Sequence, residues 1–294
     1  MSMKQILAVL AALIGLAFAS QAAAEYTTGL ESVSLGDIKA RAEAGDGNAQ
    51  LELGHRYYYD KALKDDKKAL KWFQKAAEQN VPWAEYETAA MYENGEATPA
   101  NPVTALQWYQ KAAAAGITVA NLDIGVIYLG GETGPADPVK AASYLKIAAD
   151  SGEPRAEYLL GTLYRDGTGV GQDGTQAVAL FTDSTRQRFQ PAAEALEVMY
   201  REGTGVAKDA ILSHAWRTMS QYLLTYDQAQ AKLPKGATAS YYYLMTPKLS
   251  ADDNKAAWDI YAGFMRDFGF VHDTDDQAVA TAHDAIDHAS SIQQ

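Results

Sequence analysis

Small and apolar positions recur at helical spacing along the chain, as in Ala156, Leu160, Gly161 and Tyr164. Steps of four, one and three residues place these side chains on one face of a helix, and the small residue lets a neighbouring helix approach closely. A glycine-rich turn follows at residues 167–169, and a second helix is predicted after it. The pattern therefore predicts units of two helices joined by a glycine-rich turn.

The predicted two-helix unit recurs about every 36 residues. A polar residue precedes each second helix, and an aromatic or aliphatic residue lies within it. After the end of the second helix comes asparagine, glycine or arginine, and a tyrosine recurs on the first helices. The four series are Asp65, Asn101, Asp137, Asp173 and Asp209; Trp72, Trp108, Tyr144, Leu180 and Trp216; Asn80, Gly116, Gly152 and Arg188; and Tyr57, Tyr92, Tyr128, Tyr164 and Tyr200. Such registry indicates about five copies of one unit, and hence a stack rather than a single globule.

The polar series and the glycines predict the helix boundaries. Asp and Asn are preferred N-caps because the side-chain oxygen accepts a free backbone N–H, and Pro102 and Pro138 suit the first helical position. Gly116 and its equivalents suit the left-handed residue just past a helix end. Helices of about a dozen residues are marginal alone, so both ends of the stack need caps. We expect residues 39–45 to close the N-terminal end and a helix over 249–268 to close the other.

The expected C-terminal capping helix begins at a possible capping box formed by Ser250 and Asp253. Its apolar side chains share one face and would cover the last repeat; they are Ala257, Ile260, Tyr261, Phe264 and Phe268.

Two groups of motifs recur in phase. Residues 167–170 and 203–206 form Gly-x-Gly-Val loops, and residues 72–77 and 108–113 share an aromatic pair followed by Gln-Lys-Ala-Ala. These motifs resemble the Sel-one-like repeat (SLR) family, relatives of the tetratricopeptide repeats, over roughly residues 35–224. The resemblance implies an all-α right-handed superhelix, or solenoid, of about five SLR helix pairs plus a capping helix. It also implies an adaptor role without shared catalytic residues.

The sequence departs from this pattern in two places that matter below. Arg188 stands where the preceding units have asparagine or glycine after the second helix. Glu197 replaces the small residue of the first helix in the fifth unit.

The N-terminal residues predict export. Residues 1–24 contain Lys4, an apolar run from Ile6 to Phe18 and a small-residue end, which is typical of a cleaved signal peptide. The apolar run is too short to span a bilayer as a helix. We further expect a linker over 25–33, an SLR array over 34–225, an irregular insert over 226–248, and a capping helix with an acidic tail over 249–294. The expected location is the bacterial periplasm or the cell exterior, without stable membrane insertion after cleavage.

Cysteine content indicates how the fold is stabilised, and net charge restricts the classes of expected partner. The chain has no cysteine, so packing alone must stabilise it in an oxidising compartment. Its formal net charge of −12 repels nucleic acid and anionic lipid headgroups. Neutral or basic proteins, peptides or glycans are the expected partners, and the sequence leaves the oligomeric state open.

Chemical motifs give little support to catalysis. Ser143 and Lys146 satisfy the S-x-x-K pattern of penicillin-recognising enzymes, but neither S-D-N nor K-T-G occurs. Residues 169–174 satisfy G-x-G-x-x-G, but a helix rather than a strand is predicted before them. His283 and His288 in the acidic tail are five residues apart and cannot share a simple two-histidine site on a helix. We therefore expect no catalytic residues, metal or cofactor.

The first helices are expected to line the concave side of the solenoid. Tyrosine is favoured at interfaces because it offers a large rigid face with a polar tip. First-helix positions that the core does not claim form the candidate peptide-binding set: Tyr58, Tyr86, Glu93, Tyr158, Arg165 and Arg201. The sequence thus favours an exported, non-enzymatic scaffold or adaptor that binds a protein or peptide there. Two alternatives remain: an envelope hydrolase or β-lactam-interacting protein, and a regulator or inhibitor of an envelope protease.

Overall fold

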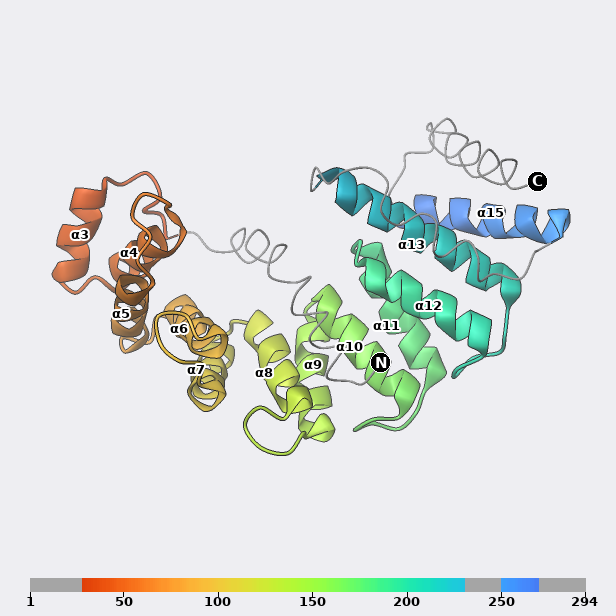
Figure 1. The fold of residues 1–294 in the computed structure, drawn as a ribbon, viewed down its shortest axis with the longest axis horizontal. Coiled ribbons are helices and arrows are strands. Elements are labelled where there is room, and N and C mark those ends of the chain that lie inside the picture. The colour runs from red at the N-terminus through yellow and green to blue at the C-terminus, as the bar shows by residue number, and fades with distance from the viewer. Residues whose placement is uncertain (1–27, 231–249, 270–294) are drawn as a thin grey trace. The chain divides into compact units, whose positions relative to one another are not determined.

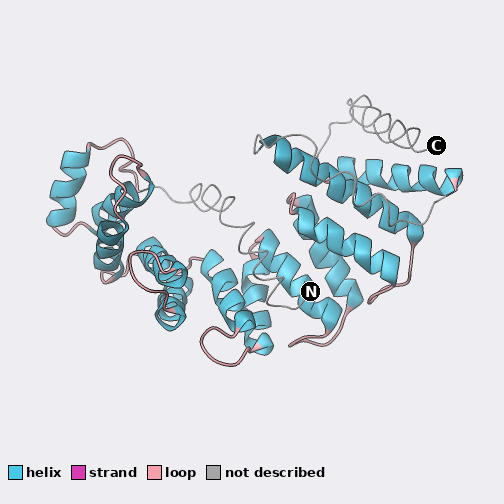
Figure 2. Cartoon of the chain, viewed as in Figure 1, coloured by secondary structure: helices cyan, strands magenta, loops and turns pink. Residues whose placement is uncertain are grey.

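The computed structural model describes residues 28–230 and 250–269, which form helices joined by turns (Figure 2). Twelve helices and no strands are present in this part of the chain, which confirms the predicted all-α class. In chain order they are α3 (Leu35–Glu43), α4 (Gly47–Tyr59), α5 (Asp66–Ala77), α6 (Pro82–Asn94), α7 (Pro102–Ala114), α8 (Val119–Gly130), α9 (Pro138–Asp150), α10 (Pro154–Asp166), α11 (Gly174–Arg186), α12 (Gln190–Glu202), α13 (Ala210–Gln230) and α15 (Ala251–Asp267).

Three sequence predictions lie wholly or largely outside the described residues: the signal peptide over 1–24, the irregular insert from residue 231 onward, and the acidic tail with its histidines. Among the helices that the structure describes, none is both long and apolar enough to cross a membrane.

Five helix pairs follow one another along the chain (Figure 1). We number them repeats 1 to 5; α4, α6, α8, α10 and α12 are the first helices, and α5, α7, α9, α11 and α13 are the second helices. The lone helix α3 precedes repeat 1, and its Ile38 and Ala42 pack with Ala49 and Leu53 of α4. An unpaired helix therefore covers the N-terminal end of the stack, as predicted.

The polar and tyrosine series together close the turn inside each repeat. Side-chain oxygens of the polar series accept backbone N–H groups at 2.9–3.1 Å, which makes N-caps of Asp65, Asn101, Asp137, Asp173 and Asp209. The backbone N–H of each of these residues donates at 2.8–2.9 Å to the carbonyl of a residue in the tyrosine series, namely Tyr57, Tyr92, Tyr128, Tyr164 and Tyr200. Because this backbone hydrogen bond recurs in every repeat, the two series share the same period.

The residues that follow the second helices share a left-handed backbone. Their φ angles are 59° at Asn80, 97° at Gly116, 85° at Gly152 and 66° at Arg188. Glycine adopts this conformation without strain, whereas a residue with a Cβ is disfavoured there. Backbone geometry therefore defines this series, and Arg188 occupies it at a cost in stability.

Small residues on the first helices make room for large residues on the second. A Cβ added at Gly125 would lie 2.7 Å from Leu145, and one added at Gly161 would lie 2.8 Å from Phe181. Both distances are too short for real contacts, so the two helices of these repeats approach closely only because the first helix has glycine.

The chain divides into two compact units. Residues 28–156 with 168–170 form unit 1, and residues 157–167, 171–230 and 250–269 form unit 2. Within unit 1, Trp108 packs against the buried cluster around Ala69 and Phe73 of repeat 1, and Tyr144 packs against the cluster around Tyr109 of repeat 2. These two members of the aromatic series therefore pack against clusters that include side chains of the preceding repeat.

The capping helix α15 completes the core of unit 2. Trp216 of α13 is only 3% exposed, and its ring stacks on Phe264 of α15 with centroids 4.1 Å apart. Ser250 accepts the backbone N–H of Asp253 at 3.1 Å and so caps the helix where a capping box was predicted. Repeat 5 is thus covered by the helix expected over residues 249–268.

One boundary differs from the sequence prediction. The irregular insert was expected to begin at residue 226, but α13 continues to Gln230. Residues 226–230 contain no glycine or proline, and the next proline is Pro234, so nothing in the local sequence ends the helix earlier. Residues 231–249 lie outside the described part.

Candidate functional site

The six candidate binding residues all lie on first helices and occupy only two positions of the repeat. The first position holds Tyr58, Glu93, Leu129, Arg165 and Arg201, and the second holds Tyr86, Leu122 and Tyr158. The charged members of the first position are acidic in unit 1 and basic in unit 2. The two units therefore offer different charge on equivalent helices.

Tyr58 belongs to an aromatic group at the end of α4. Its ring meets Tyr59 edge-on with centroids 4.7 Å apart, and the ammonium of Lys64 lies 3.9 Å from its ring centroid. Burial raises the pKa of the Tyr58 hydroxyl, and its hydrogen bond with Glu96 raises it further. Tyr59 is 55% exposed, so this group presents an aromatic face at the surface.

Tyr86 and Glu93 come together around Asp123 of α8. The Tyr109 hydroxyl donates to Glu93 Oε2 at 2.6 Å, the Tyr86 and Tyr109 ring centroids are 5.4 Å apart, and the Tyr86 hydroxyl hydrogen-bonds to Asp123. We call Tyr86, Glu93, Tyr109 and Asp123, with the nearby Arg155, the Asp123 site. Three successive first helices and one second helix contribute to it.

Electrostatics at the Asp123 site favour protonated carboxyls. Burial, followed by the charge of Glu93, raises the pKa of Asp123 to about 8, against the opposing charge of Arg155. Burial also raises the pKa of Glu93, although the hydrogen bond from Tyr109 acts in the opposite direction. Glu132 faces Glu93 and Glu153 faces Asp123, and both add negative charge. Arg155 is therefore the opposing cation for both Asp123 and Glu93.

Equivalent acidic residues in repeats 1 and 2 have cationic or histidine partners. Glu52, Glu87 and Asp123 lie at intervals of 35 and 36 residues on the first helices. Glu52 pairs with Arg56 at 2.7 Å, and Glu87 contacts His55 at 3.1 Å. Asp123 has no ion-pair partner among the described residues, and its Oδ2 is buried without a hydrogen bond. Repeat 3 therefore keeps the acidic residue but lacks the partner.

Tyr158 and Arg165 in unit 2 have internal contacts of their own. The Tyr158 ring packs on Phe181 and Phe189 with centroids 5.7 and 5.5 Å apart. Arg165 makes two hydrogen bonds to Asp166, at 2.7 and 2.9 Å. Tyr158 thus contributes to the core as well as to the surface of the first helices.

Arg201 belongs to a buried ionic group in repeat 5. Its guanidinium donates to both carboxylate oxygens of Glu197, at 2.6 and 2.8 Å, and Arg217 of α13 approaches the same carboxylate at 3.1 Å. Glu197 is only 6% exposed, so two guanidinium groups offset one buried negative charge.

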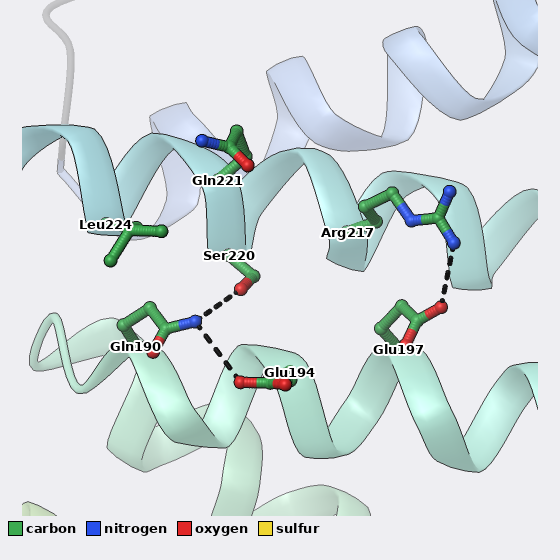
Figure 3. A pocket seen from close by; sticks show the side chains of 7 residues that line it. All are labelled: Gln190, Glu194, Glu197, Arg217, Ser220, Gln221 and Leu224. Atoms are coloured by element: carbon green, nitrogen blue, oxygen red, sulfur yellow. Dashed lines mark hydrogen bonds and ion pairs between the residues drawn. The ribbon is translucent and has the colours of Figure 1, made fainter. Parts of the chain in front are cut away.

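A shallow hollow lies beside this group, between α12 and α13 (Figure 3). Gln190 donates to Ser220 at 2.7 Å and to Glu194 at 3.5 Å across part of it (Figure 3). Its lining residues are Gln190, Glu194, Glu197, Arg217, Ser220, Gln221 and Leu224.

Comparison with known proteins accounts for the repeats. The Sel1 repeat profile matches residues 47–81, 84–117, 118–153, 154–184 and 193–216, which correspond to repeats 1 to 5. The chain belongs to the Sel1 repeat family. No curated protein gives a significant match to it.

Two solved Sel1-type structures are similar to the chain. One is c5321, a protective antigen of uropathogenic Escherichia coli with an SLR fold, at 28% identity and a TM-score of 0.63 over 85% of this chain. This chain covers 55% of the c5321 chain. The other is a Sel1 repeat protein from Oxalobacter formigenes, at 32% identity and a TM-score of 0.55, with 62% of this chain and 74% of that chain covered. These Sel1 relatives support the solenoid class.

The S-x-x-K and G-x-G-x-x-G motifs have structural contacts within the Sel1 repeats. The Ser143 hydroxyl donates to the Val139 carbonyl at 3.1 Å, and Lys146 pairs with Asp150 at 2.9 Å. Gly169 lies against the backbone of Pro138, where a Cβ would clash. The described residues contain no group of three or more metal-binding side chains.

Sequence reasoning missed Asp123, Tyr109, Arg155 and Arg217. One signal was available for the first: Glu52, Glu87 and Asp123 recur at the Sel1 period. Tyr109 belongs to the repeat motif and was assigned to the core, so its hydroxyl contact with Glu93 was not predicted. No sequence pattern brings Arg155 to this site, because that placement depends on the packing of α10.

Proposed function

We propose that this Sel1 repeat protein is an exported, non-enzymatic scaffold or adaptor that binds another protein or peptide on the face formed by its first helices. Sel1 repeats are generally non-catalytic scaffolds for protein interaction. One observation carries the proposal for this chain. The first helices of unit 1 present half-buried tyrosine and carboxylate side chains, including Tyr58, Tyr86 and Glu93, at positions that repeat packing does not require.

These side chains suit recognition of an extended segment. Tyrosine combines contact area with a polar tip and loses little conformational freedom on binding. Carboxylates that are already partly desolvated form stronger hydrogen bonds than fully hydrated ones. In unit 2, Arg165 and Arg201 would contribute positive charge at the equivalent position. We further propose that these surfaces lie on the concave side of the solenoid, and that removal of residues 1–24 accompanies export.

Photo-crosslinking tests the binding face. A benzophenone amino acid at Tyr59, which is exposed on a first helix beside Tyr58, should capture one stoichiometric partner in the native compartment. The same group at Gln107, exposed on the second helix α7, is the matched control. Equal capture at the two positions, or none at Tyr59, would contradict the proposal. The mass of the mature protein tests export, because cleavage after Ala24 leaves Glu25 as the first residue.

A further inference from the structure

The Asp123 site contains a buried acceptor without a donor. Asp123 Oδ2 is buried and accepts no hydrogen bond from any described residue, while the carboxyl group is held by the Tyr86 hydroxyl. An unsatisfied buried acceptor costs about 1–3 kcal/mol. Such atoms are rare in native proteins and point to a strained or functional position. The oxygen therefore lacks a donor that a ligand could supply.

The charge of the site indicates what kind of donor is missing. The charges of Glu93 and Glu153 act on Asp123, the charge of Glu132 acts on Glu93, and Arg155 is the opposing cation for both carboxyl groups. The two equivalent acidic residues, Glu52 and Glu87, are satisfied by Arg56 and His55. The missing group is therefore a cationic donor, which would both fill the free acceptor and reduce the excess negative charge.

The surroundings favour an organic cation over a metal ion. Within the part of the chain that the structure describes, no cluster of three or more histidine, cysteine or acidic side chains could hold a metal. The Tyr86 ring lies beside the carboxyl groups and packs on the buried Tyr109 ring, with centroids 5.4 Å apart. Aromatic faces attract guanidinium and ammonium groups, and a guanidinium can donate to a carboxylate through two parallel N–H groups.

We propose that Asp123 and Glu93 receive one arginine or lysine side chain of the segment that binds to the first helices of unit 1. This inference rests on the proposed function and specifies the chemistry of the partner. The neighbouring phenols Tyr109 and Tyr86 hydrogen-bond to Glu93 and Asp123 and so orient the two carboxyl groups. The net charge of −12 favours the approach of a basic segment.

Binding of a cation at this site is coupled to proton release. The carboxyl groups of Asp123 and Glu93 both have raised pKa values, and the groups that face them are Tyr86, Tyr109, Glu132, Glu153 and Arg155. A bound cation favours the ionised carboxylate, so it expels a proton, and affinity rises with pH up to about 8. A purely structural site would show no such coupling.

The probe is an eight-residue peptide with arginine alternating with serine, compared with the same peptide carrying neutral citrulline in place of arginine. Fluorescence anisotropy at an ionic strength of about 0.15 M limits long-range attraction. The arginine peptide should bind and the citrulline peptide should not. Asp123→Asn should weaken binding by about tenfold or more, as expected for loss of a charged hydrogen bond. Calorimetry in two buffers of different ionisation enthalpy should show proton release that Asp123→Asn reduces.

Asp150→Asn is the matched control, because Asp150 is an exposed acidic residue of unit 1 that is paired with Lys146. Equal weakening by the two variants would mean general attraction and would overturn the inference, as would unchanged binding by Asp123→Asn. Photo-crosslinking at Tyr59 separates the two proposals. If wild-type protein and Asp123→Asn capture the same partner equally, the inference fails and the proposed function stands.

Discussion

Arg217 approaches the carboxylate of Glu197 at 3.1 Å, at the place where Phe181 packs against Gly161 one repeat earlier. Glu197 follows Gly161 by 36 residues, and Arg217 follows Phe181 by the same number. Repeat 5 therefore replaces both members of a packing pair at once. The reason is physical: a lone glutamate would be a buried charge, and a lone arginine would face a glycine.

The energetic link between these residues can be measured by a double-mutant cycle. Arg217→Tyr alone should lower the free energy of unfolding by about 1–3 kcal/mol, because Glu197 would keep only Arg201 as its cationic partner. Adding Glu197→Ala recreates the Ala89–Tyr109 pair of repeat 2 and should recover most of the loss. Chemical denaturation gives the coupling energy, expected to exceed about 0.5 kcal/mol. Additive effects would show that the two positions act independently.

The Asp123 carboxyl should make stability fall as pH rises. Its pKa is raised in the folded state to about 8, against about 3.9 in the unfolded chain. The folded state therefore binds the proton more tightly, and this contribution to stability is complete at low pH and lost between about pH 4 and 8. For this single group, the free energy of unfolding should fall by no more than about 1.4 kcal/mol per pH unit.

Thermal midpoints at pH 5, 7 and 9 test this dependence. Asp123→Asn should flatten the decline, because an amide does not ionise. Asp150→Asn should leave it unchanged, since Asp150 is exposed and paired with Lys146. An identical pH profile for wild-type protein and Asp123→Asn would contradict the expectation.

Ala97 has a left-handed backbone, with φ 65°, at the position where later repeats have Gly169 and Gly205. A residue with a Cβ pays about 1–2 kcal/mol there. Ala97→Gly should therefore raise the free energy of unfolding by about 0.5–1 kcal/mol. The gain is smaller than the relieved strain because the substitution also removes a partly buried methyl group. Ala115, with φ −84°, is the control, and Ala115→Gly should give no gain.

Phe264 covers Trp216 with ring centroids 4.1 Å apart. Phe264→Ala should destabilise repeat 5 by about 2–4 kcal/mol, because it removes most of an aromatic contact from the end of the stack. Amide exchange in α13 should quicken, and the emission of Trp216 should shift to the red. Phe268→Ala, at a more distant stacked ring (6.3 Å), should have a smaller effect; the reverse order would contradict this packing.

Ser143 should have no role as a nucleophile. Its hydroxyl donates to the Val139 carbonyl, and Lys146 is paired with Asp150. A fluorescent penicillin should therefore label neither wild-type protein nor Ser143→Ala. Covalent labelling that disappears in Ser143→Ala would revive the β-lactam-interacting alternative.

Periodicity predicted the fold because repeat packing is local. The N-caps at Asp65 and its equivalents, the helix ends and the capping helix all depend on residues close in sequence, so their signals could be read directly. The Asp123 site depends instead on side chains from α6, α7, α8 and α10 meeting in space. Tyr109 and Arg155 carry no local sign of that meeting. The sequence also indicated Glu197 as an exception, but its partner Arg217 became apparent only from the packing of α12 on α13.

The Glu197–Arg217 pair lies between α12 and α13, the two helices of a single repeat. Duplication or exchange of the whole repeat therefore carries both members together and keeps the buried carboxylate paired. Recombination within the turn over residues 203–209 would separate them, because each helix of repeat 5 would then meet a helix that has glycine, alanine or an apolar residue at the facing position. Hybrid arrays made from this chain should therefore be joined between repeats rather than inside them.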